Sequence, residues 1–88
     1  MPQAITTRYY GPTNTKPSRI KATAEAGSVT LSWDHRYNVD KNHDRAAIEL
    51  IRKMGWHGEY VRGWLPDNSG VYVASKGGAF GELIVVDR

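Results

Sequence analysis

Hydrophobic and polar residues alternate most regularly along residues 19–34, RIKATAEAGSVTLSWD. A reversal at Ala26 and Gly27 places the apolar side chains on one face, because successive residues of a strand point to opposite sides of a sheet. On the apolar face, the implied register pairs Ala24 with Val29, Ala22 with Leu31, and Ile20 with Trp33. On the polar face, it pairs Thr23 with Thr30, Lys21 with Ser32, and Arg19 with Asp34. Arg19 then faces Asp34, and opposite charges across two strands stabilise their pairing. The pattern predicts an antiparallel hairpin over residues 19–34.

A helical period follows the hairpin and predicts an α-helix over residues 42–54. Asp40 or Asn42 can cap its first amides, and Gly55 stands just beyond its last turn, where helices commonly end. We expect Trp56 to fold back onto the apolar stripe of this helix, as part of the core. The stripe has the spacing i, i+3, i+4 and i+7 and consists of Ala47, Leu50, Ile51 and Met54.

Shorter alternating or apolar runs predict four more strands, at residues 4–10, 59–65, 71–75 and 81–86. Segments rich in Pro, Gly and small polar residues separate them and predict loops, such as GPTNTKPS and PDNSG. The last run lacks alternation over residues 83–86, so we expect its side chains to be buried on both faces. These elements predict an α+β fold, an antiparallel sheet of five or six strands with a single helix packed on one face.

Composition sets limits on this picture. The chain has 88 residues, 40% of them hydrophobic, which suffices for one core but not two, so residues 1–88 are expected to form a single domain. The chain has no cysteine, which excludes disulfides and thiolate metal sites. No apolar run approaches the ~20 residues of a membrane span, and the first residues lack signal-peptide features, so we expect a cytoplasmic protein without membrane contact. The net charge of +3 is spread along the chain and permits nucleic-acid contact without favouring it. A monomer and a homodimer both remain open.

The three histidines are the first candidates for catalytic or metal chemistry. His35 and His43 stand beside Asp34 and Asp44, and His57 follows farther along. A fold that collected them would form a metal or acid–base site. However, no pair has a recognised zinc-ligand spacing, and each histidine lies where exposed polar residues are ordinary. We therefore expect no metal site.

Nucleophilic and phosphate-binding motifs are also missing. Ser32 and Ser75 lack the surroundings of a nucleophile elbow, and GGAFG at residues 77–81 is not followed by the Lys-Ser/Thr of a phosphate loop. The sequence predicts a protein that is not an enzyme, with no catalytic residue and no cofactor.

One aromatic and basic group stands above this background. On a strand over residues 59–65, Tyr60, Arg62 and Trp64 share a face, and we expect Arg8 and Tyr10 to lie beside them. Such a surface can stack unpaired bases, and the same residue types anchor protein interfaces. The alternative is that the aromatic rings cover the sheet as core while the arginine extends to solvent. We predict these five residues as the partner-binding surface.

Three segments resemble a class of short uncharacterised proteins encoded on phages, prophages and plasmids: YYGPTNTKPSRIKATAEAG, VTLSWDH and NHDRAAIELIRKMGWHG. The class has a Tyr-x-Gly-Pro-Thr-Asn opening, a Ser-Arg-Ile-Lys-Ala strand and an Asn-His-x-x-Ala-Ala helix that ends in Gly-Trp. The similarity covers about residues 9–58, whereas the last strands look longer than those of the class. The resemblance implies an accessory protein in the cytoplasm of a bacterial host, one that binds and inhibits a host protein or complex, in defence (as anti-CRISPR proteins do) or in regulation. Nucleic-acid binding by the basic and aromatic sheet surface is the alternative.

Overall fold

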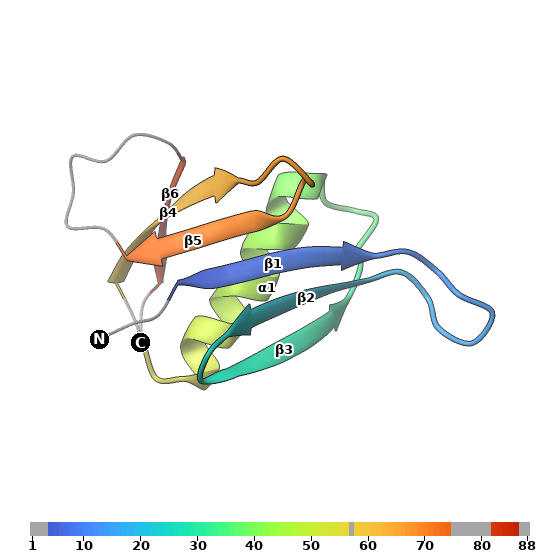
Figure 1. The fold of residues 1–88 in the computed structure, drawn as a ribbon, viewed down its shortest axis with the longest axis horizontal. Coiled ribbons are helices and arrows are strands. Elements are labelled where there is room, and N and C mark those ends of the chain that lie inside the picture. The colour runs from blue at the N-terminus through green and yellow to red at the C-terminus, as the bar shows by residue number, and fades with distance from the viewer. Residues whose placement is uncertain (1–3, 57, 75–81, 87–88) are drawn as a thin grey trace.

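The computed structural model describes residues 4–56, 58–74 and 82–86, which form one antiparallel sheet of six strands with one helix across one face (Figure 1). The strands run across the sheet in the order β3-β2-β1-β5-β4-β6. This arrangement confirms the predicted α+β fold. The elements in chain order are β1 (Ile5–Tyr10), β2 (Arg19–Ala24), β3 (Gly27–Ser32), α1 (Val39–Lys53), β4 (Gly58–Trp64), β5 (Gly70–Ala74) and β6 (Glu82–Val86).

The β2–β3 hairpin exists, but the predicted register is wrong by two residues. Ile20 pairs with Leu31, and Ala24 pairs with Gly27, so the chain reverses at residues 25 and 26. A shift of two residues leaves every side chain on its predicted face, so alternation alone does not separate the two registers. The terminal methyl of Met54 at the end of α1 lies close to Gly27, 2.9 Å from where a Cβ at this residue would stand.

The helix begins three residues earlier than predicted, and neither Asp40 nor Asn42 caps it. Asn38 is the cap, and its side-chain oxygen accepts a hydrogen bond of 2.8 Å from the amide of Lys41. Asn42 is buried inside the helix and uses its side chain to hold the preceding loop, with bonds to the amide and carbonyl of Asp34. The predicted helix end is confirmed, since Met54 is the C-cap and Gly55 follows with a φ of 75°.

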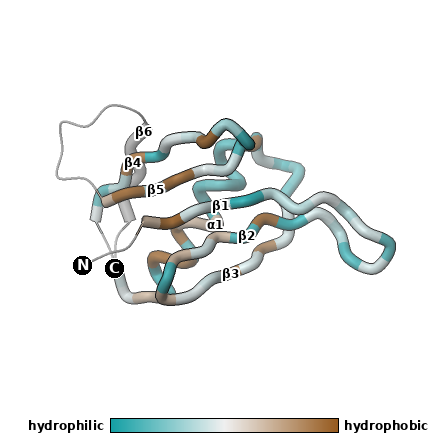
Figure 2. Tube along the Cα trace, viewed as in Figure 1, coloured by the Kyte–Doolittle hydropathy of each residue, from teal (hydrophilic) through white to brown (hydrophobic). Residues whose placement is uncertain are grey.

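The core lies between α1 and the sheet face that it covers. Three residues of the predicted helical stripe are fully buried, and Met54 and Trp56 pack against the core as partly buried side chains. Figure 2 shows hydrophobic positions recurring in the strands and in α1, whereas the loop between β1 and β2 is mostly hydrophilic. The buried apolar cluster comprises Ile5, Ile20, Ala22, Ala24, Ala46, Ala47, Leu50, Ile51, Tyr60 and Tyr72.

Two predictions at the C-terminal end lie outside the described residues. One is the prediction that GGAFG at residues 77–81 is not a phosphate loop, and the other is the burial of the side chains of β6. Within the described residues, the helix is neither long enough nor apolar enough to cross a bilayer.

Candidate functional site

The sheet register places Tyr60, Arg62 and Trp64 on the face that α1 covers. Arg62 pairs with Tyr72, and Tyr72 pairs with Ile5 of the core, so these side chains share that face. Tyr60 is fully buried and Arg62 is 7% exposed, whereas Trp64 is 43% exposed. The expectation that Tyr60 and Arg62 lie on an open surface is therefore wrong. Alternation showed that the three residues share a face, but not that the helix covers it.

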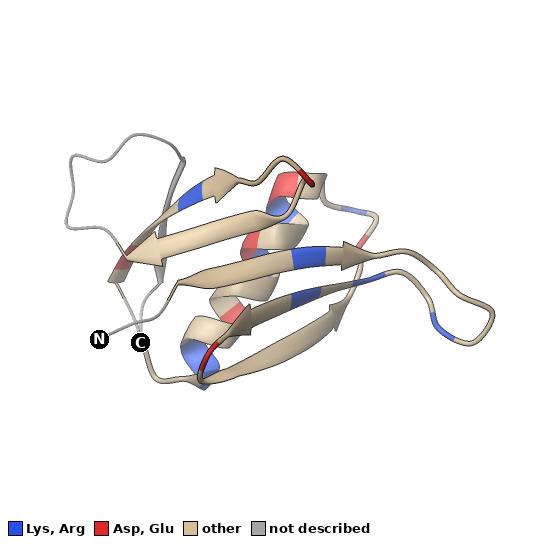
Figure 3. Cartoon of the chain, viewed as in Figure 1, with Lys and Arg blue, Asp and Glu red and all other residues tan. Residues whose placement is uncertain are grey.

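Arg8 and Tyr10 lie on the opposite face of the sheet, which α1 does not cover, so they do not lie beside Trp64. Arg8 pairs across the strands with Lys21, and Tyr10 pairs with Arg19. The guanidinium carbon of Arg19 lies 5.3 Å from the centre of the Tyr10 ring. Figure 3 shows basic positions side by side on β1 and β2. These two predicted residues belong to a separate surface, the outer basic patch, defined by Arg8, Tyr10, Arg19 and Lys21.

The buried guanidinium of Arg62 is compensated by carboxylates of α1. Its Nη1 donates to both carboxylate oxygens of Asp44, at 2.7 and 2.8 Å, and the hydroxyl of Tyr72 donates to the same carboxylate at 2.6 Å. Burial lowers the pKa of Arg62, but the hydrogen bonds and charge of Asp44 outweigh it, so the pKa lies above its ordinary value. Arg62 also lies over the Trp64 ring, 5.4 Å from its centre. It therefore supports Trp64 from inside the protein.

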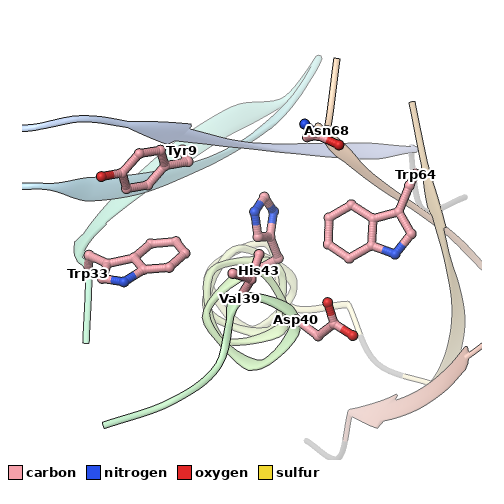
Figure 4. A pocket seen from close by; sticks show the side chains of 7 residues that line it. All are labelled: Tyr9, Trp33, Val39, Asp40, His43, Trp64 and Asn68. Carbon is pink, nitrogen blue, oxygen red and sulfur yellow. The ribbon is translucent and has the colours of Figure 1, made fainter. Parts of the chain in front are cut away.

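Beyond Trp64, the start of α1 and the ends of several strands enclose a pocket of about 550 Å³. Figure 4 shows Tyr9 and Trp33 on one side of His43 and Trp64 on the other, with Asp40 at the helix start. This space, the aromatic pocket, is lined by Tyr9, Trp33, Val39, Asp40, His43, Trp64 and Asn68.

The rings around the aromatic pocket hold one another in place through edge-to-face contacts. Tyr9 and Trp33 have ring centres 4.8 Å apart at an angle of 72°. His43 contacts Trp64 in the same way, with centres 4.9 Å apart at 78°. Such edge-to-face geometry is favourable for aromatic pairs. The walls are thus ordered, although Tyr9 and Trp64 remain 46% and 43% exposed.

His43 forms the buried floor of the aromatic pocket. Its Nδ1 and the hydroxyl of Thr7 share a buried hydrogen bond of 2.7 Å. Burial lowers the pKa of His43 below its ordinary value, although Asp44 and Asp40 act in the opposite direction. The imidazole is therefore neutral at pH 7. A neutral, packed histidine contributes shape and polarity to the floor but no charge.

Gly70 is required for this arrangement. It pairs with Thr7 on one side and Trp64 on the other. A Cβ at residue 70 would lie 2.5 Å from the Thr7 hydroxyl, and 3.4 Å from both His43 Nδ1 and the Trp64 ring. Only a residue without a side chain lets these three groups meet beneath the pocket.

The rim of the pocket is polar. The side chain of Asp40 is 56% exposed and lies 3.5 Å from Arg62, a longer contact than the 2.7 Å to Asp44. Asn68 adopts a left-handed φ of 70°, which asparagine tolerates better than most residues, and this turn brings it to the pocket. The arrangement offers aromatic walls, a neutral floor and an accessible carboxylate.

His35 and Ser32, two other residues weighed from the sequence, do not join this site. His35 is exposed in the loop before α1, and His57 lies outside the described residues. No three His, Asp or Glu side chains in the described parts of the chain come close enough to hold a metal ion. Ser32 is exposed at the end of β3, and Ser75 lies outside the described residues.

Sequence reasoning identified Trp64 but missed the other pocket residues. A usable signal was present for His43, because it stands four residues before Ala47 and so extends the helical stripe. Alternation likewise put Tyr9 on the face of Ile5. Nothing in the local patterns indicated that these residues meet Trp33 and Trp64 at one end of the sheet.

Comparisons of the chain with protein-family models, with curated proteins and with solved structures give no match. The resemblance to mobile-element proteins therefore stays a prediction.

Proposed function

We propose that this chain is a non-enzymatic accessory protein of a phage or other mobile element, which binds and inhibits a host defence or regulatory protein through the aromatic pocket. The observation that carries the proposal is the exposure of Tyr9 and Trp64, 46% and 43%, at the walls of an ordered pocket of about 550 Å³. Tryptophan and tyrosine in ordered, concave surroundings are the side chains that most often dominate the energy of protein interfaces.

Binding accounts for the site better than catalysis does. His43 and Asp40 are the pocket residues with suitable acid–base chemistry, but the Nδ1 of His43 is engaged with Thr7, which is itself fully buried. A general base needs a reacting group within hydrogen-bond reach, and a nucleophile needs access to its substrate. Buried Thr7 offers no such access. The pair supports the pocket floor instead.

Nucleic-acid binding through the outer basic patch is the second candidate. It is favoured by the cross-strand neighbours Arg8 and Lys21 and by the stacked Arg19–Tyr10 pair on a helix-free sheet face. Open sheets with aromatic and basic side chains are a recurrent surface for single strands. This candidate predicts affinity for short oligonucleotides that falls steeply with salt, because phosphate contacts release counterions.

The experiment that separates the two candidates is affinity capture from bacterial host lysate with the tagged full chain, with and without nuclease, followed by mass spectrometry. The proposed function predicts recovery of the same host protein or complex in both samples. Recovery that disappears after nuclease treatment, together with salt-sensitive oligonucleotide binding, would favour the outer basic patch and overturn the proposed function.

A further inference from the structure

We infer that the aromatic pocket takes the cationic end of a lysine or arginine side chain of the partner protein. The inference rests on the proposed function, since it names the group that the partner inserts. It follows from three features of the pocket: the faces of its rings, its unbalanced charge and its size.

The rings are the first feature. A cation within about 6 Å of the face of a tryptophan or tyrosine ring is attracted by the negative charge density of that face. This protein already uses the interaction inside the site, since Arg62 lies 5.4 Å from the centre of the Trp64 ring. Tyr9 and Trp33 meet edge to face, and both residues line the pocket. A second cation therefore has aromatic surface to contact.

Charge is the second feature. The cluster beneath the rim contains Asp40, Asp44 and a single guanidinium, and that guanidinium makes its two short bonds to Asp44. His43 adds no positive charge because burial keeps its imidazole neutral. Asp40 therefore presents a negative charge at the rim, with its side chain 56% exposed. A cation neutralises this charge, whereas an anion would be repelled by it.

Size is the third feature. The pocket of about 550 Å³ lies within the range of about 300–1,000 Å³ that is usual for ligand sites. Val39 is 55% exposed at its edge and offers apolar surface to an alkyl stem. Lysine and arginine combine such a stem with a terminal cation, and they can pack the stem while the charge meets Asp40.

The test is a titration of the full chain with capped single amino acids. Binding is monitored through the NMR signals of the tryptophan indole N–H groups. Nα-acetyl N-methylamides of lysine, arginine, norleucine and glutamate are the probes, because norleucine has the stem of lysine without its charge. We expect both cationic probes to shift the Trp33 and Trp64 signals and to bind roughly fivefold to thirtyfold more tightly than norleucine. The lysine and arginine probes show whether the pocket prefers an ammonium or a guanidinium group.

Two variants test whether Asp40 at the rim causes the preference for cationic probes. Asp40→Asn should remove most of the advantage of the cationic probes, and added salt should weaken it as well. Glu49→Gln makes the same change of charge at an exposed position farther along α1 and should leave the preference intact.

The inference is overturned if norleucine or glutamate binds as tightly as lysine and arginine, or if the cationic probes leave both indole signals unmoved at millimolar concentrations. It is also overturned if Asp40→Asn and Glu49→Gln keep the same preference. These results would not decide the proposed function, which is tested separately by nuclease-resistant capture of a host protein.

Discussion

Arg62 on β4 and Arg8 on β1 lie on opposite faces of one sheet. Arg62 is 7% exposed, holds the carboxylate of Asp44 and lies over Trp64. Arg8 is exposed, with Lys21 as its neighbour across the strands. The inner arginine is thus part of the structure that supports a pocket, while the outer one is exposed. The same residue type therefore has two environments, and the position of the helix decides between them.

The comparison extends to the aromatic residues of each face. On the inner face, Tyr9, Trp33 and Trp64 gather around a concave space whose walls are fixed by ring contacts. On the outer face, Tyr10 is 37% exposed and carries Arg19 against its ring. An ordered concavity suits a single inserted anchor, whereas an open basic surface suits an extended polyanion.

The largest expected effect is on the inner face. Asp44→Ala should lower the free energy of unfolding by about 3–5 kcal/mol, because it leaves the buried guanidinium of Arg62 without its main partner. Chemical denaturation followed by fluorescence measures the change. Asp40→Ala is the matched control, and it should cost at most about 1 kcal/mol because its contact with Arg62 is long and exposed. Equal losses in both variants would show that Arg62 does not depend on Asp44 as described.

A second comparison uses Gly63 of β4 and Gly70 of β5, two neighbouring glycines on opposite faces of the sheet. Gly70→Ala should destabilise by about 1–3 kcal/mol, because its Cβ would overlap the Thr7 hydroxyl beneath the pocket. Gly63→Ala meets no atom within 4 Å on the outer face and should be neutral or stabilise by up to about 1 kcal/mol. Thermal melts of the two variants test the pair. A tolerated Gly70→Ala would contradict the close packing of Thr7, His43 and Trp64.

The pH dependence of stability tests the buried floor of the pocket. The folded-state pKa of His43 lies below the ordinary value of 6.5, so the unfolded chain binds the proton more readily than the folded one. The stabilisation is fully present above pH 6.5 and is lost as the pH falls from there toward the folded pKa, at no more than about 1.4 kcal/mol per pH unit. Denaturation curves recorded across this window should show the loss.

The control for this prediction is the other described histidine. His43→Gln should remove the dependence in that window, and His35→Gln, at an exposed position, should preserve it. A parent protein whose stability does not change between pH 7 and 5 would argue against a buried neutral histidine.

The smallest effect on stability belongs to the outer basic patch. Arg8→Ala combined with Lys21→Ala should change the free energy of unfolding by no more than about 0.5 kcal/mol per substitution, as at other surface sites. If the patch binds oligonucleotides, the same variant should weaken that binding and flatten its salt dependence. Fluorescence anisotropy over a range of salt concentrations measures both properties.

The hydrophobic pattern predicted the helix and the strands of this fold. It also predicted which side chains share a face of the sheet, but not which residues those side chains contact. Alternation placed Tyr60, Arg62 and Trp64 together, and the helical stripe identified Leu50 and Ile51 as core. Neither pattern states which face of a sheet a helix covers. The prediction of an exposed Arg62 failed for this reason, since its compensation by Asp44 joins residues 18 positions apart in sequence.

Neither the hairpin register nor the pocket could be predicted from local sequence patterns, because both depend on contacts between elements. Two registers that differ by two residues sort side chains identically, so alternation does not choose between them. The pocket joins Tyr9, Trp33 and Trp64 through the order of the strands, in which β1 lies between β2 and β5. That order results from tertiary packing and leaves no periodic signal in the chain.

The central claim is that the aromatic pocket, and not the outer basic patch, binds the partner. The most direct measurement is the affinity of the captured host protein for the parent chain, for Trp64→Ala, and for Arg8→Ala combined with Lys21→Ala, with thermal melts to confirm that each variant is folded. We predict that Trp64→Ala weakens binding by about thirtyfold or more, as expected for an interface anchor, and that the outer variant binds like the parent. Parent-like binding by Trp64→Ala, with loss of binding in the outer variant, would contradict the claim.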